Sequence, residues 1–204
     1  DAAAGRNVRS ELQLVGRKLI LTVGRMSASE AYKGHDRVIE VMPALLAKHP
    51  DLVYVVLGDG DDRNRLEVLA RRHGVDASVR FVGELDRATM RDVYRAADVF
   101  VMPSTDEGFG IVFLEAMACG TPAVGLSEKG ARDALVDGVL GIATRPDDLS
   151  ATILSALDDP PLEGEALAQA VRERFGRETF ERQVGTFFNQ LMQSPAGRSR
   201  SGTV

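Results

Sequence analysis

Glu107 and Glu115 stand on either side of a glycine-rich turn, a pattern suited to a sugar attached to a diphosphate. The turn follows a short apolar run and opens an expected helix, and Gly108 and Gly110 allow close backbone approach. The free N–H groups at the start of such a helix attract phosphate oxygens. Glu115, about one turn into the helix, can accept two hydrogen bonds from a ribose diol. Glu107, on the loop, can face a pyranose on the other side of the diphosphate.

Two cations follow the first expected strand. Gly24 follows that strand directly, Arg25 comes next, and Lys33 closes the loop. A guanidinium fork and an ammonium group together suit a diphosphate held without a metal. Their contribution would be electrostatic, through attraction to the phosphate oxygens. The competing interpretation is a pair of solvated loop cations.

The elements that position these residues alternate between strand-like apolar runs and helix-like stretches, which predicts parallel βαβ units. Strands are expected at Leu19–Val23, Leu52–Leu57, Val79–Val82, Val99–Met102, Pro122–Gly125 and Gly141–Ala143. Helices are expected at His35–Lys48, Asp62–His73, Arg87–Ala97, Ile111–Cys119, Pro146–Leu157, Leu162–Phe175 and Glu178–Met192. The sequence therefore predicts an α/β, Rossmann-like, doubly wound parallel sheet, in which ligands bind beyond the carboxyl ends of the strands.

At these motifs the chain resembles the donor-binding, carboxy-terminal half of retaining GT-B glycosyltransferases, the group 1 or family 4 class. Glu107 and Glu115 match the paired-glutamate signature of that class in spacing. The flanks Gly108-Phe109-Gly110 and Glu115-Ala116-Met117-Ala118-Cys119-Gly120-Thr121-Pro122 match as well. The resemblance runs from about Leu19 to about Asp158, which is most of the chain.

The resemblance implies a role for each matching residue. Glu107 would bind donor-sugar hydroxyls, Glu115 the ribose, and the backbone amides of Phe109, Gly110 and Ile111 the phosphates. Arg25 and Lys33 would contact the phosphates and stabilise the leaving nucleoside diphosphate, with Gly24 in the same site. The interval between Arg25 and Lys33 is longer than the commonest family pattern. No metal or other cofactor is expected beside the donor, a UDP- or GDP-hexose.

Two further strand ends belong to the expected donor site. The turn Gly58-Asp59-Gly60 lacks the third glycine of a dinucleotide fingerprint, because Arg63 occupies its place, so NAD binding is disfavoured. Family members carry a similar turn, and Gly58 is assigned to the donor pocket, with a plain tight turn as the alternative. In the family the backbone after the third strand contacts the nucleobase, which points to Val82 through Leu85.

The expected domain organisation follows from the same resemblance. Residues 1–16 are predicted to be a linker or interdomain segment, 17–176 the nucleotide-sugar-binding domain, 177–194 a terminal helix, and 195–204 a disordered tail. The terminal helix carries apolar residues on one face and needs a surface to pack on. In the resembled family that surface is the amino-terminal Rossmann-like domain, for which this chain is too short. The first residue is Asp1, which suggests a fragment.

Composition excludes several classes of protein. The 204 residues suit one α/β domain, and a formal net charge of -5 gives no electrostatic case for nucleic-acid binding. The single cysteine cannot form an internal disulfide, and the three histidines have no partners at metal-ligand spacing. No transmembrane or signal segment stands out. The expected location is the cytoplasm, with the full-length enzyme able to sit peripherally at the inner face of the membrane.

The sequence thus predicts the donor-binding domain of a retaining hexosyltransferase that acts on a glycan or lipid-linked acceptor, as in bacterial polysaccharide biosynthesis. The isolated domain is expected to be inactive, because its binding cleft has only one wall. Two alternatives stay open, a non-catalytic nucleotide-sugar-binding module and a GT-B sugar-nucleotide epimerase. A nicotinamide oxidoreductase is the weakest option.

Overall fold

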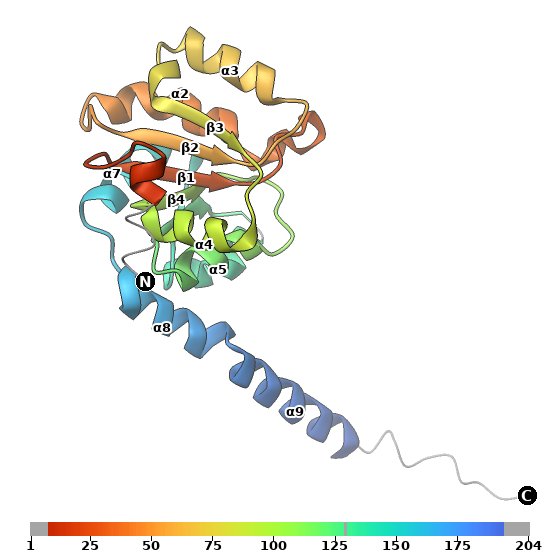
Figure 1. The fold of residues 1–204 in the computed structure, drawn as a ribbon. Helices are drawn as coiled ribbons and strands as arrows, with labels where there is room; N and C mark the ends of the chain where they lie inside the picture. The colour runs from red at the N-terminus through yellow and green to blue at the C-terminus, as the bar shows by residue number, and fades with distance from the viewer. Residues whose placement is uncertain (1–7, 129, 194–204) are drawn as a thin grey trace, which may run out of the picture.

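Six short apolar segments form one parallel sheet, as predicted. The computed structural model describes residues 8–128 and 130–193. The sheet order is β3-β2-β1-β4-β5-β6, with every pair parallel. The strands are β1 Leu19–Val23, β2 Val53–Leu57, β3 Val79–Gly83, β4 Val99–Met102, β5 Ala123–Leu126 and β6 Ile142–Thr144. The doubly wound Rossmann-like fold is therefore confirmed (Figure 1).

Helices cover both faces of the sheet, and side-chain alternation along the strands decides which core each residue joins. Ile20 points to the face covered by α2 (His35–Leu46), α3 (Arg63–Arg72) and α7 (Leu149–Asp158). Leu21 points to the opposite face, covered by α4 (Arg87–Ala96), α5 (Ile111–Ala118) and α8 (Gly164–Phe175). The short helix α6 (Ala131–Ala134) joins this second layer. Its four residues were not predicted, since they are too few to show a helical period.

The strand order reverses beside β1, which pairs with β2 on one side and β4 on the other. Ile20 lies opposite both Tyr54 and Val99 in these two ladders. The segments after β1 and β4 diverge to opposite faces of the sheet, and a crevice opens between them at the carboxyl edge. The residues singled out in the sequence at 24–34 and 103–115 all follow one of these two strands.

The segment before β1 packs onto the domain. Val8 and Leu14 are buried in the core under α4 and α5. Arg9 pairs with Asp98 at 2.8 Å and also donates to the carbonyl oxygens of Ala96 and Arg17. Residues 8–14 therefore brace the amino ends of β1 and β4, where Leu19 N also donates to Asp98.

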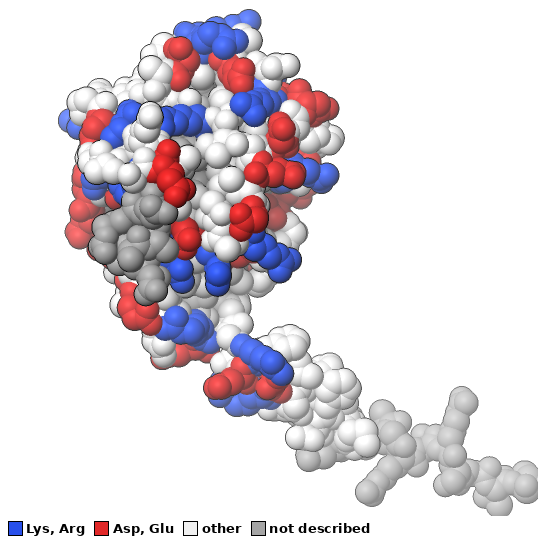
Figure 2. All heavy atoms as spheres, in the orientation of Figure 1, with Lys and Arg blue, Asp and Glu red and all other residues white. Residues whose placement is uncertain are grey.

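The last helix, α9 (Arg177–Gln193), extends away from the sheet in line with α8 (Figure 1). Its apolar side chains are more than half exposed, at Phe180, Phe187, Phe188 and Leu191. Figure 2 shows charges of both signs interspersed over this face of the domain, and a stretch without charges toward the far end of α9. Among the described residues, no helix combines the length and apolar character that a membrane span requires.

Candidate functional site

The loops after β1 and β4 are held together by backbone contacts. Thr105 N donates to the Tyr32 carbonyl at 3.0 Å, and the Arg37 guanidinium donates to the Pro103 carbonyl at 2.6 Å. Gly34 adopts φ +78°, and a Cβ on it would lie 2.5 Å from the Pro103 oxygen. Only glycine fits this approach, so the two loops lie in direct contact at the carboxyl edge.

A cavity of about 230 Å³ opens between these loops and the start of α5. Lys33 and Glu107 both line it, although they are far apart in the sequence. Its other lining residues are Val23, Gly24, Met102, Phe109, Gly110, Ile111 and Val112. Gly110 caps α5 in the left-handed conformation, and a Cβ there would meet the Phe113 ring at 2.6 Å. The structure thus brings a cation, a carboxylate and a helix amino terminus to one cavity. The cation and the helix amino terminus suit an anionic group, and the carboxylate suits hydroxyl donors.

Arg25 and Lys33 are brought together by a residue that the sequence analysis missed. The Glu30 carboxylate pairs with the Arg25 guanidinium and, at 2.5 Å, with the Lys33 ammonium. The hydrogen bond from Lys33 is the main cause that lowers the pKa of Glu30 below its usual range. The unusually long interval between the two cations folds into a 3₁₀ helix, Ala28–Lys33, which places Glu30 between them. An acidic residue between two loop cations was the only signal for it.

Gly58 supports this loop from the neighbouring strand. Its φ is +131°, and a Cβ on it would lie 2.2 Å from the Gly24 carbonyl oxygen. Gly60 approaches the Met26 carbonyl equally closely, and Met26 N donates to Asp59 O at 3.0 Å. The Gly-Asp-Gly turn therefore packs backbone against backbone beneath the Gly24–Arg25 corner. Gly58 lines neither of the two cavities at this edge, and it packs against Gly24, which lines the smaller one.

Glu115 faces a second cavity, a groove of about 460 Å³ between α4 and α5. Its lining residues are Arg87, Met90, Arg91, Tyr94, Glu115, Ala118 and Cys119. The buried Tyr94 hydroxyl donates to Glu115 Oε2 at 3.0 Å. Burial, and then the Glu115 carboxylate, raise the pKa of Tyr94 above its ordinary value, so the phenol stays protonated. The two glutamates thus line separate cavities, Glu107 the one before α5 and Glu115 the groove between α4 and α5.

Val82 and Leu85 pack partly buried against the core below α4. Within the described part of the chain they line neither of the two cavities. The neighbouring Gly83 accepts a hydrogen bond from Gly58 N at 2.8 Å, which ties this strand end to the Gly-Asp-Gly turn. The helix after this strand, α4, begins with a side-chain cap, since the Asp86 carboxylate accepts from Ala88 N and Thr89 N.

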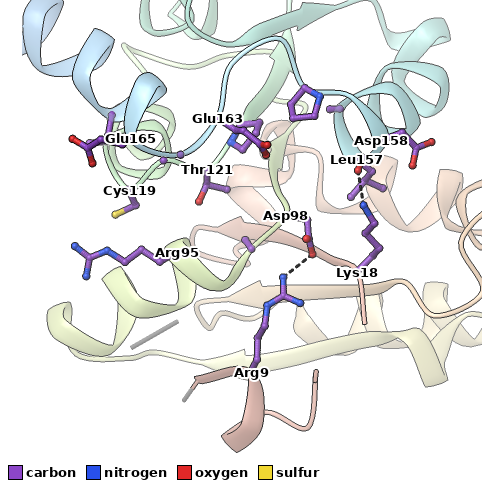
Figure 3. Close-up of a pocket in the computed structure, with 18 of the residues that line it drawn as sticks. Arg9, Lys18, Arg95, Asp98, Cys119, Thr121, Leu157, Asp158, Glu163 and Glu165 are labelled. Atoms are coloured by element: carbon purple, nitrogen blue, oxygen red, sulfur yellow. Dashed lines mark hydrogen bonds and ion pairs between the residues drawn. The ribbon is translucent and has the colours of Figure 1, made fainter. Parts of the chain in front are cut away.

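A larger cavity, of about 990 Å³, lies at the opposite, amino edge of the sheet (Figure 3). Arg9 pairs there with Asp98, and Lys18 Nζ donates to the Leu157 carbonyl at 2.6 Å. Arg172 pairs with Glu165. Its cations are thus engaged with carboxylates and carbonyls of the fold, and Figure 3 shows Arg9 and Lys18 directed at these partners.

Two buried polar atoms near the carboxyl edge have no hydrogen-bond partner among the described residues, His35 Nε2 and Ser104 Oγ. Burial, and then the neighbouring Lys33 charge, lower the pKa of His35 to about 4. His35 is therefore neutral near pH 7. Over the described residues no group of three His, Cys, Asp or Glu side chains could hold a metal ion.

Comparisons with known proteins agree on one family. The family model "Glycosyl transferases group 1" matches residues 6–177. The chain is 37% identical over 158 residues to a glycogen synthase of Mycobacterium tuberculosis, covering 76% of this chain and 37% of that protein. It is 33% identical over 173 residues to a GDP-mannose-dependent monoacylated alpha-(1-6)-phosphatidylinositol monomannoside mannosyltransferase of Corynebacterium glutamicum, covering 79% and 44%.

A solved structure resembles the fold over nearly its whole length. It is the C-terminal domain of a glycosyl transferase group 1 family protein, LpcC, from Francisella tularensis. The TM-score is 0.69 at 25% identity, covering 83% of this chain and 91% of that one. The chain spans less than half the length of the two curated relatives. With a family model that covers most of its residues, the chain belongs to the group 1 glycosyltransferases.

Proposed function

We propose that this chain is the donor-binding, carboxy-terminal half of a retaining, family 4 glycosyltransferase. It would bind a UDP- or GDP-hexose, from which the whole enzyme transfers the hexose to a glycan or lipid-linked acceptor. The observation that carries the proposal is the shared cavity of Lys33, Glu107 and the start of α5. A cation and free helix amides suit the diphosphate, and a carboxylate beside them suits sugar hydroxyls.

In this arrangement the diphosphate lies against the amino terminus of α5, with Lys33 on one side and Arg25 nearer the solvent. The side chain of Lys33 is only 16% exposed and that of Arg25 is 71% exposed, so Lys33 acts in the less solvated environment. As the glycosidic bond breaks, negative charge grows on the β-phosphate, and these cations stabilise it. Phosphate oxygens would take the place of the Glu30 carboxylate, and the site would need no metal.

The nucleoside would continue along α5 to the groove between α4 and α5, where Glu115 accepts hydrogen bonds from the ribose hydroxyls. Glu107 would remain on the sugar side. The groove that Glu115 shares with Tyr94 supports this division, because it is a cavity separate from that of Glu107. The backbone from Val82 to Leu85 is proposed to contact the base.

The acceptor site would lie in a second Rossmann-like domain supplied by the rest of the protein. The match to a structure described as a C-terminal domain supports this, as does the share of the relatives that the chain spans. The exposed apolar face of α9 is proposed to pack on that domain. We expect the chain alone to transfer no sugar, and the whole enzyme to act in the cytoplasm, at the inner membrane face when its acceptor is a lipid. The Corynebacterium relative, by its name, combines a nucleotide-hexose donor with a lipid acceptor.

Calorimetric titration of this chain with UDP, GDP and ADP, each with magnesium and with EDTA, tests the proposal. We expect one nucleotide to bind equally well in both buffers and Glu115→Ala to weaken it about tenfold or more, the cost of a lost pair of charged hydrogen bonds. The matched control is Glu163→Ala, another exposed glutamate, which lines the amino-edge cavity. Equal losses in the two variants, or binding that requires magnesium, would contradict the proposal.

A further inference from the structure

The ribose side of the site contains a buried hydroxyl that packing does not require. Tyr94 lies in the last turn of α4 and is 2% exposed. Its ring contacts Phe100 at a centroid distance of 5.9 Å, and Phe100 contacts Phe113 of α5 at 5.5 Å. A phenylalanine would fill the same volume and make the same ring contacts. Packing in the core therefore does not explain why this residue carries a hydroxyl group.

The backbone of Tyr94 is fixed independently of that hydroxyl. Thr121 Oγ1 donates to the Tyr94 carbonyl at 2.5 Å, and Thr121 N donates to Ala116 O at 3.0 Å. The Tyr94 carbonyl is thus tied by the Thr121 hydroxyl to the segment just after α5, and its ring contacts α5 through Phe100 and Phe113. The hydroxyl oxygen of Tyr94 can shift little relative to the first turns of α5, where Glu115 lies.

The partner of this oxygen is a carboxylate that is otherwise free to move. Glu115 is exposed, and an exposed glutamate samples several rotamers at a cost in entropy when a ligand fixes one of them. The Tyr94 hydroxyl donates to Oε2 at 3.0 Å, which leaves Oε1 and the second lone pair of Oε2 as acceptors. Both side chains line the same groove. The bond selects one orientation of the carboxylate before a ligand arrives.

We propose that Tyr94 is a positioning residue that orients Glu115 toward the vicinal diol of a ribonucleotide. This inference rests on the proposed function, because it takes the ligand of Glu115 to be a ribose. It adds a specificity determinant, since the hydroxyl of Tyr94 makes the site discriminate ribonucleotides from nucleotides that lack the diol. Tyr94 itself touches only the carboxylate, and its effect passes through Glu115.

The test compares Tyr94→Phe with Tyr54→Phe in this chain. Tyr54 is the matched control, because it is also buried and its hydroxyl donates to Thr22 Oγ1 at 2.9 Å in the sheet, away from the groove. Calorimetric titrations use UDP and GDP and the 2′,3′-dideoxy form of each. Near-UV circular dichroism and thermal unfolding follow the fold of each variant.

We expect Tyr94→Phe to weaken the ribonucleotide about five- to tenfold, in line with one lost orienting hydrogen bond, and to leave the dideoxy form unchanged. The double variant Tyr94→Phe/Glu115→Ala should bind no more weakly than Glu115→Ala alone, because the two residues act as one unit. Tyr54→Phe should leave the affinity for both ligands unaltered. A loss that depends on the diol is a result that general damage to the fold would not produce.

Three results would overturn the inference. If Glu115→Ala loses ribonucleotide affinity and Tyr94→Phe does not, the hydroxyl has no positioning role and the proposed function stands. If Tyr94→Phe weakens the ribonucleotide and the dideoxy form equally, the residue is structural. If the unaltered chain binds no ribonucleotide, the inference and the proposed function fail together.

Discussion

The two edges of the sheet differ in what their charged residues do. At the amino edge Arg9 pairs with Asp98 across a sequence separation of 89 residues, and Lys18 donates to the end of α7. These contacts tie separate elements together. At the carboxyl edge Arg25 and Lys33 pair with Glu30 inside one short loop, and the cavity beside them is far smaller.

Under the proposed function the nucleotide binds at the smaller cavity, so cavity volume would not locate the ligand site in this fold. At the larger cavity, Arg9, Lys18 and Arg172 already pair with carboxylate or carbonyl oxygens of the domain. An anionic ligand there would have to compete with these contacts. At the smaller cavity, Gly110 adopts a positive φ at the amino terminus of α5. Lys33, which lines this cavity, pairs with Glu30, a carboxylate that a phosphate can replace. Three substitutions and one pH series test this contrast between the two edges.

Gly58→Ala should destabilise the domain by about 4 kcal/mol and abolish nucleotide binding, because positive φ strain and a clash with backbone add together. The new Cβ would lie 2.2 Å from the Gly24 carbonyl oxygen. Gly74→Ala is the control, since it also has positive φ but meets nothing within 4 Å, and should cost only about 1 kcal/mol. Denaturant unfolding measures both variants, and equal costs would show that the close approach at Gly58 is unimportant.

Stability should fall as the pH drops from about 6.5 to about 4, because of His35. In the folded chain its pKa is about 4, below the ordinary histidine pKa of 6.5, so across this pH range the unfolded chain binds a proton that the folded chain does not. The free energy of unfolding would decrease by up to about 3 kcal/mol, and the contribution is fully present above about pH 6.5.

His35→Asn should flatten this pH dependence, and His73→Asn, at an exposed position, should leave it unchanged. Urea unfolding at a series of pH values supplies the measurement. The same slope in the His35 variant as in the unaltered chain would assign the effect to other groups.

Lys33→Met should weaken nucleoside diphosphate binding about tenfold, the effect of one charge-assisted contact to phosphate. Lys18→Met, at the amino edge, should lower the melting temperature without changing the affinity. Titration calorimetry and thermal scans on both variants separate the two roles. Reduced affinity in the Lys18 variant with a normal Lys33 variant would reverse the comparison between the edges.

Glu30→Gln should tighten nucleoside diphosphate binding about threefold at low salt, since the carboxylate competes with phosphate for the same cations. The expected gain shrinks as salt screens the contact. Glu67→Gln is a suitable control, because that carboxylate pairs with Arg63 on α3 at 3.0 Å. Weaker binding in the Glu30 variant would mean that Glu30 orients the cations and does not compete with the ligand.

The strands and the glycine turns could be predicted from the sequence because their signals are local. The β1 and β4 segments are short apolar runs, and their predicted bounds were confirmed. The parallel, doubly wound arrangement followed from the alternation of strands and helices, and the strand order came from the structure. By contrast β5 begins at Ala123, one residue after the predicted Pro122, whose carbonyl accepts from Phe100 N.

The contacts of Tyr94 and Glu30 were not predictable from the sequence, because they form only when the chain folds. Tyr94 has the position of an ordinary core residue on α4, and only the packing of α4 on α5 shows that its hydroxyl contacts Glu115. Glu30 lies in a loop without periodicity, and its role depends on the 3₁₀ turn that brings Arg25 and Lys33 together. The ligand-binding roles of the site residues, those of Glu107 and Glu115 as well as those of Val82 and Leu85, stay predictions.

Hydrogen–deuterium exchange of this chain with and without UDP or GDP tests the central claim that the carboxyl edge binds the donor. If the donor binds at the carboxyl edge, nucleotide should slow exchange in residues 24–34 and 105–115 and leave residues 157–165 at the amino edge unchanged. Slower exchange confined to residues 157–165 would contradict it and assign the nucleotide to the larger cavity.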